Sequence, residues 1–283
     1  MELIHRIKDL RHFVQSHRSA GKRIALVPTM GNLHAGHIRL VEEARRHGDI
    51  VVCTIFVNPM QFGPNEDLDA YPRTLDADMT KLRKAGCDCV FAPTVAEVYP
   101  HGLHQQTVVS VPGISARHCG ASRPGHFDGV ATVVSKLFNM VEPDTALFGL
   151  KDYQQFMVIT RMVADLCIPV QLVGVETQRE ESGLALSSRN GYLSADEKQR
   201  ASTLFQVLQH SAEQLLAGDA NADVEAKALT ALQAVGFRPD YFTVCHAQTL
   251  EPASHSDHDL VILAAAWMGK TRLIDNIRVQ RND

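Results

Sequence analysis

Residues 24–47, IALVPTMGNLHAGHIRLVEEARRH, decide the fold of this chain. The apolar run at 24–27 is typical of a buried strand, and apolar residues return at helical spacing from Ile38 onward. The turn between them, residues 28–37, has two glycines that allow a ligand to approach the backbone closely. A strand, a small-residue turn and a helix N-terminus together form a site for phosphate. This stretch therefore predicts a phosphate-binding βα unit.

Two histidines, His34 and His37, stand three positions apart in this turn. If the helix starts near Ala35, both rings can face the ligand, and imidazolium groups there would donate hydrogen bonds to an anion. Two alternatives stay open. Either ring can simply cap or pack the helix, and a metal pair is possible although no His-Glu-x-x-His carboxylate accompanies the histidines.

The string PTMGNLHAGH resembles the His-x-Gly-His signature of the nucleotidyltransferase superfamily. In that superfamily the histidines contact ATP phosphates and stabilise the charge that develops as AMP is transferred. The string by itself indicates only the superfamily.

The composition is that of an ordinary globular protein, with 283 residues, 45% hydrophobic and 21% charged. Such a length allows one large domain or two moderate ones. The net charge of −4 does not indicate a positively charged surface that could bind phosphates of DNA or RNA, so we expect no nucleic-acid partner.

Neither a signal peptide nor a membrane span is expected. The first 23 residues have helical apolar spacing interrupted by charge, and no apolar run approaches the roughly 18 residues that a span requires. The six cysteines form no Cys-x-x-Cys pair, which favours reduced thiols in the cytoplasm. Cys87 and Cys89 share a strand face without a second ligand pair, so zinc is disfavoured.

A second apolar run, residues 50–57, is typical of a central parallel strand. It ends just before Asn58 and Gln61, whose amides can offer hydrogen bonds to a small polar substrate beyond the carboxyl end of the strand. The alternative is a turn in which both amides satisfy their own backbone.

Further along the chain, a short strand at 145–149 turns at 150–155 into a helix, and another strand follows at 170–175. Lys151 would then stand at the same sheet edge as His37 and could place a cation on phosphate. A lysine at a helix start is unfavourable with the helix dipole, which favours a functional role. The repeated βα order predicts a doubly wound parallel sheet.

Residues 176–190 break this pattern with the string ESGLALSSRNG. A Ser-Ser-Arg loop can hold phosphate with two hydroxyls and a guanidinium, although such a turn is by default only solvated. Beyond a capping box formed by Ser194 and Glu197 come two helical segments (195–217, 221–235) and three strands. We therefore expect a Rossmann-like α/β domain at 1–176 and a smaller α+β C-terminal domain at 177–283.

Six strings in the same order resemble the pantothenate synthetases (pantoate–β-alanine ligases) from about residue 3 to 279: PTMGNLHAGH, FVNPMQFGPNEDLDAYPRTL, SRPGHF, FGLKDYQQ, GLALSSRNGYL and TRLIDN. The resemblance implies a two-step reaction. The carboxylate of (R)-pantoate attacks the α-phosphate of ATP to give pantoyl adenylate and pyrophosphate. The amine of β-alanine then displaces AMP. The resemblance also implies Mg²⁺ arriving with ATP, with unknown protein ligands, and a homodimer.

The resemblance also assigns residues. Those implied in ATP binding are Met30, Gly31, Asn32, Leu33, His34, Ala35, Gly36, His37, Gly149, Leu150, Lys151, Asp152, Gln178, Leu186, Ser187, Ser188 and Arg189. Pantoate and β-alanine are assigned to Gln61, Gln155 and the neighbouring Asn58. The catalytic set is His34, His37, Lys151, Ser187, Ser188 and Arg189, with His37 in the position of the proton donor.

Some positions depart from the usual pattern of the family, namely Leu150, Glu176, Gln178, Ser182 and His246. None of them replaces a residue assigned to chemistry, and Gln178, near the adenine, is the one most expected to matter. Two other hypotheses remain: a nucleotidyltransferase that acts on a phosphate ester, and an inactive nucleotide-binding module. The second predicts damage at His37, Lys151 or Arg189, which are all intact.

Overall fold

The computed structural model describes residues 1–64 and 66–281, so residue 65, within the string FVNPMQFGPNEDLDAYPRTL, and residues 282–283 at the end of the predicted second domain lie outside the described residues. The internal contacts divide the chain into two units. Unit 1 comprises Met1–Ala116, Gly120–Leu150 and Val158–Glu176. Unit 2 comprises Arg117–Cys119, Lys151–Met157 and Thr177–Asp283.

Unit 1 contains a six-stranded sheet in the order β1-β4-β3-β2-β5-β6, and every neighbouring pair is parallel. The central strands are apolar and buried, as the continuous apolar runs predict. The predicted doubly wound α/β fold is confirmed. The strands are β1 (Glu2–Ile4), β2 (Ile24–Thr29), β3 (Ile50–Ile55), β4 (Cys89–Phe91), β5 (Thr145–Gly149) and β6 (Gln171–Val175).

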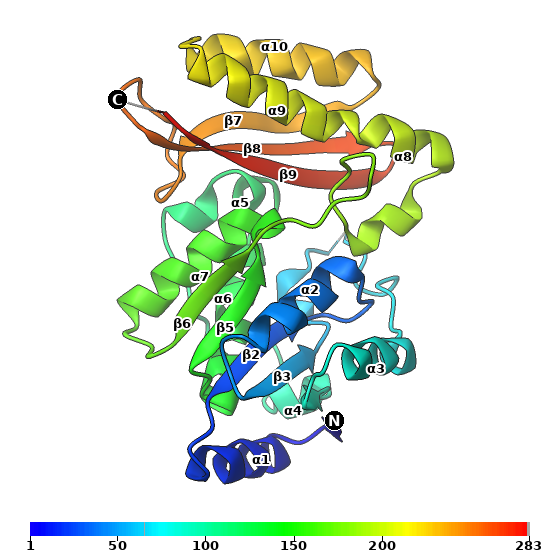
Figure 1. Ribbon diagram of the computed structural model, residues 1–283, viewed down its shortest axis with the longest axis vertical. Helices are drawn as coiled ribbons and strands as arrows, with labels where there is room; N and C mark the ends of the chain where they lie inside the picture. The colour runs from blue at the N-terminus through cyan, green and yellow to red at the C-terminus, as the bar shows by residue number, and fades with distance from the viewer. Residues whose placement is uncertain (65, 282–283) are drawn as a thin grey trace. The chain divides into compact units, whose positions relative to one another are not determined.

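Helices cover both faces of this sheet (Figure 1). On one face α2 (Ala35–Ala44) and α3 (Leu75–Lys84) pack over alternate side chains of β2 and β3. On the other face α6 (His126–Val141) packs Phe138 edge-on against Phe148 of β5, and α1 (Ile7–Ser19) contacts α6. The remaining helices of the first part of the chain are α4 (Val95–Val98), α5 (Cys119–Ser122) and α7 (Tyr153–Asp165).

Unit 2 is built on an antiparallel sheet of β7 (Arg238–His246), β8 (Asp259–Met268) and β9 (Thr271–Gln280). Two helices, α9 (Thr203–Leu216) and α10 (Asn221–Ala234), lie over one face of this sheet (Figure 1) and contribute Leu204, Leu208, Leu215 and Leu232 to its hydrophobic core. The shorter α8 (Ala195–Ala201) begins with the predicted capping box of Ser194 and Glu197. The predicted α+β architecture of this part is confirmed.

The structure differs from the sequence-based expectation in three places. Leu3 belongs to the edge strand β1, which is too short to show a pattern, and not to the N-terminal helix. The expected helix 195–217 is two helices that meet at Ser202, whose hydroxyl donates to the carbonyl of Gln199 and competes with the helical ladder. In residues 93–125, for which the sequence predicts no helix or strand, short helical turns form, including η2 (Ile114–Ala116).

Among the described helices, none has the length and the apolar composition that crossing a membrane requires.

Candidate functional site

The turn from β2 to α2 lies where the connections of the sheet change direction, because β3 and β4 extend to one side of β2 and β5 and β6 to the other. In open α/β sheets ligands bind at this point, beyond the carboxyl ends of the strands. β2 ends at Thr29, and the turn then adopts positive φ at Gly31 (+86°) and Asn32 (+49°). The predicted phosphate turn is therefore at the position in the sheet where a ligand is expected.

His34 and His37 sit at the start of α2 with ring centroids 4.1 Å apart. The backbone N–H of Gly36 donates to Nδ1 of His34 at 3.1 Å, and the backbone N–H of His34 donates to Nδ1 of His37 at 3.3 Å. A backbone N–H can only donate, so each Nδ1 must accept and each ring carries its proton on Nε2. This geometry corrects the expected imidazolium: both rings are held as neutral Nε2–H tautomers.

The backbone N–H groups of this turn are largely used inside the protein. Those of Asn32 and Leu33 both donate to the carboxylate of Asp78 on α3, each at 2.8 Å, and that of Gly36 donates to His34. Among the first N–H groups of α2, which a helix N-terminus is expected to leave open, that of Gly36 is already used by His34. The donors that the turn can present to an anion include the histidine Nε2–H groups.

Asn58 caps the short helix η1 (Pro59–Gln61) that follows β3, and Gln61 is the last residue of this helix, but only one of the two side chains can serve a substrate. Asn58 is 1% exposed; its Nδ2 donates to Gly129 O (3.0 Å) and to Gln61 Oε1 (3.2 Å). Its Oδ1 accepts from the N–H of Met60 and from the hydroxyl of Tyr99. An amide has two donor hydrogens and two acceptor lone pairs, so Asn58 is saturated. The expectation that Asn58 binds substrate is corrected: this side chain holds Gln61.

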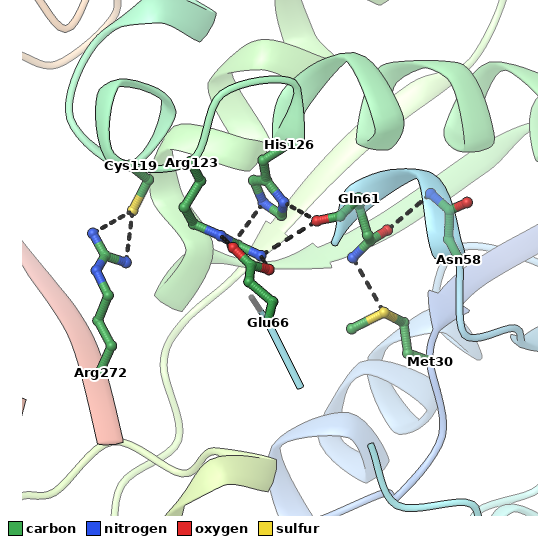
Figure 2. Close-up of polar contacts among 8 residues, drawn as sticks. All are labelled: Met30, Asn58, Gln61, Glu66, Cys119, Arg123, His126 and Arg272. Carbon is green, nitrogen blue, oxygen red and sulfur yellow. Dashed lines mark hydrogen bonds and ion pairs between the residues drawn. The ribbon is translucent and has the colours of Figure 1, made fainter. Parts of the chain in front are cut away.

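Gln61 is only partly buried, and its amide has a defined direction. Because Oε1 accepts from Asn58, Nε2 is the end that points away, and it lies 3.1 Å from the sulfur of Met30 (Figure 2). A thioether is a weak acceptor that a better one can replace. Gln61 is thus oriented as a hydrogen-bond donor.

The backbone of Gln61 is held by the SRPGHF motif (Figure 2). Nδ1 of His126 and Nη2 of Arg123 both lie within hydrogen-bond distance of Gln61 O, and Arg123 also forms a two-pronged ion pair with Glu66. Burial would raise the pKa of Glu66, but the hydrogen bond and charge of Arg123 outweigh burial and lower it. The motif therefore fixes the segment that carries the donor amide.

The FGLKDYQQ motif begins where β5 ends at Gly149 and continues as η3 (Leu150–Asp152). The side chain of Leu150 lies directly against Gly174 of β6, where any side chain would collide with it. Leu150 therefore serves the packing of unit 1, which accounts for an apolar residue at this position.

The next residues of this motif belong to unit 2. The carbonyl of Lys151 accepts from Nδ2 of Asn276, a residue of the TRLIDN motif, at 2.9 Å. Gln154 is 5% exposed and spans the 117–119 segment: its Oε1 accepts from the N–H of Cys119, and its Nε2 donates to the carbonyl of Arg117. Its neighbour Gln155 is only half-buried. The sequence-based choice of Gln155 over Gln154 thus agrees with the burial of the two side chains.

The Ser-Ser-Arg loop starts the short helix η4 (Ser188–Tyr192). The hydroxyl of Ser187 accepts from the N–H of Arg189, so Ser187 caps this helix. Asn190 stabilises the loop, because its side chain is buried and donates a hydrogen bond to the carbonyl of Ala185. The loop therefore has a defined fold although its sequence is that of a solvated turn.

Gln178 and Leu186, two residues assigned to nucleotide binding, are brought together by a hairpin. The N–H of Leu186 donates to the carbonyl of Gln178, and between them Arg179 forms a two-pronged ion pair with Asp275 of β9. The guanidinium of Arg179 also lies 3.5 Å from the ring centre of Phe205. This hairpin ties residues 178–186 to the core of unit 2.

Buried thiols occur in both units. Burial raises the pKa of Cys87 to about 11 and that of Cys89 to about 12, so both stay protonated at neutral pH and are poor ligands for zinc. In unit 2 the guanidinium of Arg272 lies 3.4 and 3.5 Å from the sulfur of Cys119 (Figure 2). Within residues 1–64 and 66–281, no three His, Cys, Asp or Glu side chains are grouped as a metal site.

Sequence reasoning missed Asp78, Lys81 and Tyr99. A signal for Asp78 did exist, because a carboxylate that stands four positions before Leu82 shares the buried stripe of its helix. Tyr99 gave no signal, since its partner Asn58 is 41 positions away in the chain.

Comparison with known proteins identifies the family. The family model of the pantoate-beta-alanine ligases matches residues 2–278. A pantothenate synthetase from Hahella chejuensis is 57% identical over 280 residues, covering 99% of each chain, and one from Pseudomonas savastanoi pv. phaseolicola is 54% identical over 283 residues, covering 100% of each.

Solved structures support the same family assignment. The pantothenate synthetase of Thermus thermophilus matches with a TM-score of 0.92 and 46% identity over 98% of this chain and 99% of that one. The Francisella tularensis pantoate-beta-alanine ligase, complexed with beta-gamma ATP and beta-alanine, matches with a TM-score of 0.82 and 33% identity, over 98% and 97%. The chain belongs to the pantoate–β-alanine ligase family.

Proposed function

We propose that this chain performs the reaction of its family with the residues described above. The chain is an ATP-dependent ligase that condenses (R)-pantoate with β-alanine to pantothenate through pantoyl adenylate, releasing pyrophosphate and AMP. The observation that carries the residue assignment is the pair His34 and His37 at the start of α2, each bound at Nδ1 by a backbone N–H.

In the first step a carboxylate oxygen of pantoate forms a bond to the α-phosphorus while the bond from that phosphorus to the bridging oxygen breaks and pyrophosphate leaves. Negative charge spreads over the phosphate oxygens as this happens, and donors fixed in advance stabilise it. We assign this role to the Nε2–H groups of His34 and His37, within the ATP-binding turn 30–37.

Unit 2 and the end of β5 supply the remaining ATP contacts in this proposal. Lys151 provides a cation for the phosphates, and Ser187, Ser188 and Arg189 provide hydroxyls and a planar guanidinium that can bind them in a two-pronged way. Backbone and side-chain contacts to the nucleoside are assigned to Gly149, Leu150, Asp152, Gln178 and Leu186. We propose that residues 1–176 are the catalytic domain that binds ATP and pantoate, and that residues 177–283 are a lid domain that adds Ser187, Ser188 and Arg189 to the catalytic set.

In the second step the neutral amine of β-alanine forms a bond to the acyl carbon of the adenylate. The bond from that carbon to the phosphate oxygen breaks, AMP leaves with the bonding electron pair on that oxygen, and the nitrogen releases one proton to solvent water. Gln61 and Gln155 are assigned to pantoate, with Gln61 also near β-alanine. The orientation of Gln61 supports a donor role, because its Oε1 is already bound to Asn58. For a neutral His37 ring, the proton-donor position that the resemblance implies becomes a hydrogen bond from Nε2–H to a phosphate oxygen, without transfer of the proton.

Three broader features complete the proposal. Mg²⁺ would enter with ATP, because phosphate oxygens are the hard ligands that this ion prefers. The enzyme works in the cytoplasm, a location supported by its six free cysteines. It acts as a homodimer, as its family resemblance implies.

Pyrophosphate release tests the proposal. With ATP, Mg²⁺ and pantoate alone, we expect pyrophosphate; on adding β-alanine, we expect AMP and the amide. Release of pyrophosphate that depends on a phosphate ester instead of pantoate would favour a nucleotidyltransferase.

Two variants test the residue assignment in the same assay. His37→Ala and Lys151→Ala should each slow adenylation by roughly two to three orders of magnitude, the effect of losing one well-placed transition-state donor. His210→Ala and Lys84→Ala, at exposed helical positions, are the matched controls. Near-normal adenylation in both site variants would refute the assignment.

A further inference from the structure

We propose that Asp78 and Lys81 of α3 are positioning residues that set the orientation of the histidine at position 37. The proposal rests on the function proposed above, because it concerns how the ATP-binding histidines are held. Neither residue lies in any of the six strings that resemble the family, and both act on the backbone of the turn.

Asp78 binds the turn through its whole carboxylate. The side chain is fully buried; Oδ1 accepts from the N–H of Leu33 at 2.8 Å, and Oδ2 accepts from the N–H of Asn32 at 2.8 Å. The hydroxyl of Thr74 donates to Oδ2 at 3.0 Å. Several donors on one carboxylate are what a buried negative charge requires. Asp78 thus fixes two consecutive amides of the turn.

The conformation of the turn requires stabilisation of the kind that these hydrogen bonds to Asp78 provide. Asn32 has φ +49°, a left-handed conformation that costs about 1 kcal/mol or more in a residue other than glycine and persists only where the surroundings enforce it. At Gly31, with φ +86°, an added Cβ would lie 3.1 Å from Ile55 Cγ2 and 3.3 Å from Asp78 Oδ2. The carboxylate of Asp78 therefore stabilises the conformation of the turn and also leaves little room for a side chain at position 31.

Lys81 acts on the next peptide group. Its Nζ donates to the carbonyl of Leu33 at 2.6 Å, and the N–H on the other side of that same peptide, at His34, donates to Nδ1 of His37. A peptide group is planar and rigid, so fixing its C=O fixes the direction of its N–H. Lys81 is thus connected to the His37 ring through one rigid plane.

This connection determines which nitrogen of His37 faces a ligand. As long as the N–H of His34 points at Nδ1, the proton of the ring is on Nε2, and Nε2–H is the donor. If the 33–34 peptide rotates, Nδ1 loses this backbone donor, and with it the contact that places the ring proton on Nε2. A displacement of about 1 Å in a catalytic group can cost on the order of a hundredfold in rate.

Lys81→Met is the first test, because it keeps the apolar stem and removes the ammonium group. We expect the pantoate-dependent rate of pyrophosphate release to fall about tenfold to a hundredfold, the usual effect of losing an outer contact to a functional side chain. The pantoate KM and the thermal midpoint should stay near those of the wild type. Lys84→Met, an exposed lysine of the same helix, is the matched control.

A double variant separates positioning from general damage. If Lys81 works through His37, then Lys81→Met/His37→Ala should be no slower than His37→Ala alone, because the ring that Lys81 orients is gone. Multiplication of the two rate losses in the double variant would overturn the proposal. If His37→Ala itself retains a normal rate, the proposed function fails; if only Lys81→Met retains a normal rate, this inference alone fails.

Asp78→Asn tests the carboxylate, with the exposed Asp76→Asn as control. An asparagine that accepts one N–H turns its own NH₂ toward the other, so the rate should fall, and the Mg²⁺ concentration for half-maximal rate should not change. Recovery of the rate in excess Mg²⁺ would show that Asp78 is a metal ligand and would overturn its positioning role. If Asp78→Asn does not fold, the Lys81 double variant still decides the proposal.

Discussion

Two pairs of amides, Asn58 with Gln61 in unit 1 and Gln154 with Gln155 in unit 2, contain the same functional groups in different surroundings. In each pair one side chain is buried and bonded within the protein, and the other is only partly buried. The pairs differ in what the buried member holds. Asn58 binds the amide of Gln61 itself, whereas Gln154 binds the backbone at Cys119 and Arg117.

This difference separates two ways of supporting a site. In unit 1 the buried amide determines which end of its partner faces a ligand, because Gly129 O and the N–H of Met60 fix the direction of Asn58, and Asn58 fixes that of Gln61. In unit 2 the buried amide joins α7 to the 117–119 segment through backbone groups. Loss of Asn58 should therefore affect both stability and pantoate binding, and loss of Gln154 chiefly stability.

Asn58→Leu should have the largest effect. It leaves the carbonyl of Gly129, the N–H of Met60 and the hydroxyl of Tyr99 without this partner, and each buried polar group left unsatisfied costs about 1–3 kcal/mol. We expect a fall of about 3 kcal/mol or more in the free energy of unfolding, measured in urea. In protein that still folds, kcat/KM for pantoate should fall as well.

The control for this variant is Gln61→Leu, which should lower kcat/KM for pantoate by about tenfold to a few hundredfold, the value of a hydrogen bond to a charged group. Its unfolding midpoint should hardly change, because Gln61 is partly exposed. If Asn58→Leu is unstable but has wild-type kinetics with pantoate, the connection between the two amides has no functional role.

Gln154→Leu should have a smaller effect, and one restricted to stability. The variant leaves the N–H of Cys119 and the carbonyl of Arg117 without their partner, which should cost about 2 kcal/mol in the free energy of unfolding. Gln155→Leu is the matched variant one residue along: it should keep its stability and lose activity with pantoate. The reverse result, with Gln154→Leu inactive and Gln155→Leu unstable, would exchange the assignments of the two glutamines.

These pairs also show what the sequence can and cannot predict. Apolar runs and helical spacing predicted the parallel sheet and the helix at Ala35, because burial of a strand or a helix face is visible in local pattern. The choice between Asn58 and Gln61 was not visible locally, since the groups that saturate Asn58 come from Gly129 and Tyr99, far along the chain. Long-range contacts decide which of two identical functional groups is left for a ligand.

The same reason explains the turn of the histidines. The sequence indicated that His34 and His37 share a face, but it also predicted imidazolium rings and open N–H groups. Whether an N–H is open depends on its neighbours in the folded chain, and in the first turn of α2 the N–H of Gly36 donates to Nδ1 of His34. The sequence could therefore indicate that His34 and His37 lie together at the start of a helix, but not which hydrogen bonds their rings and the neighbouring N–H groups form.

Tyr99→Phe should have the smallest effect and the most selective one. The change removes only the hydroxyl that donates to Asn58 Oδ1 at 2.7 Å, and Oδ1 keeps the N–H of Met60. One lost hydrogen bond costs about 1 kcal/mol, so the pantoate KM should rise by less than about tenfold. Lys136→Met is the control, because Lys136 Nζ lies 4.9 Å from the centre of the Tyr99 ring. This variant changes the packing of the ring and leaves its hydroxyl in place. An equal rise in both variants would attribute the effect to packing of the ring; a rise in Tyr99→Phe alone would show that the hydroxyl orients the amide pair.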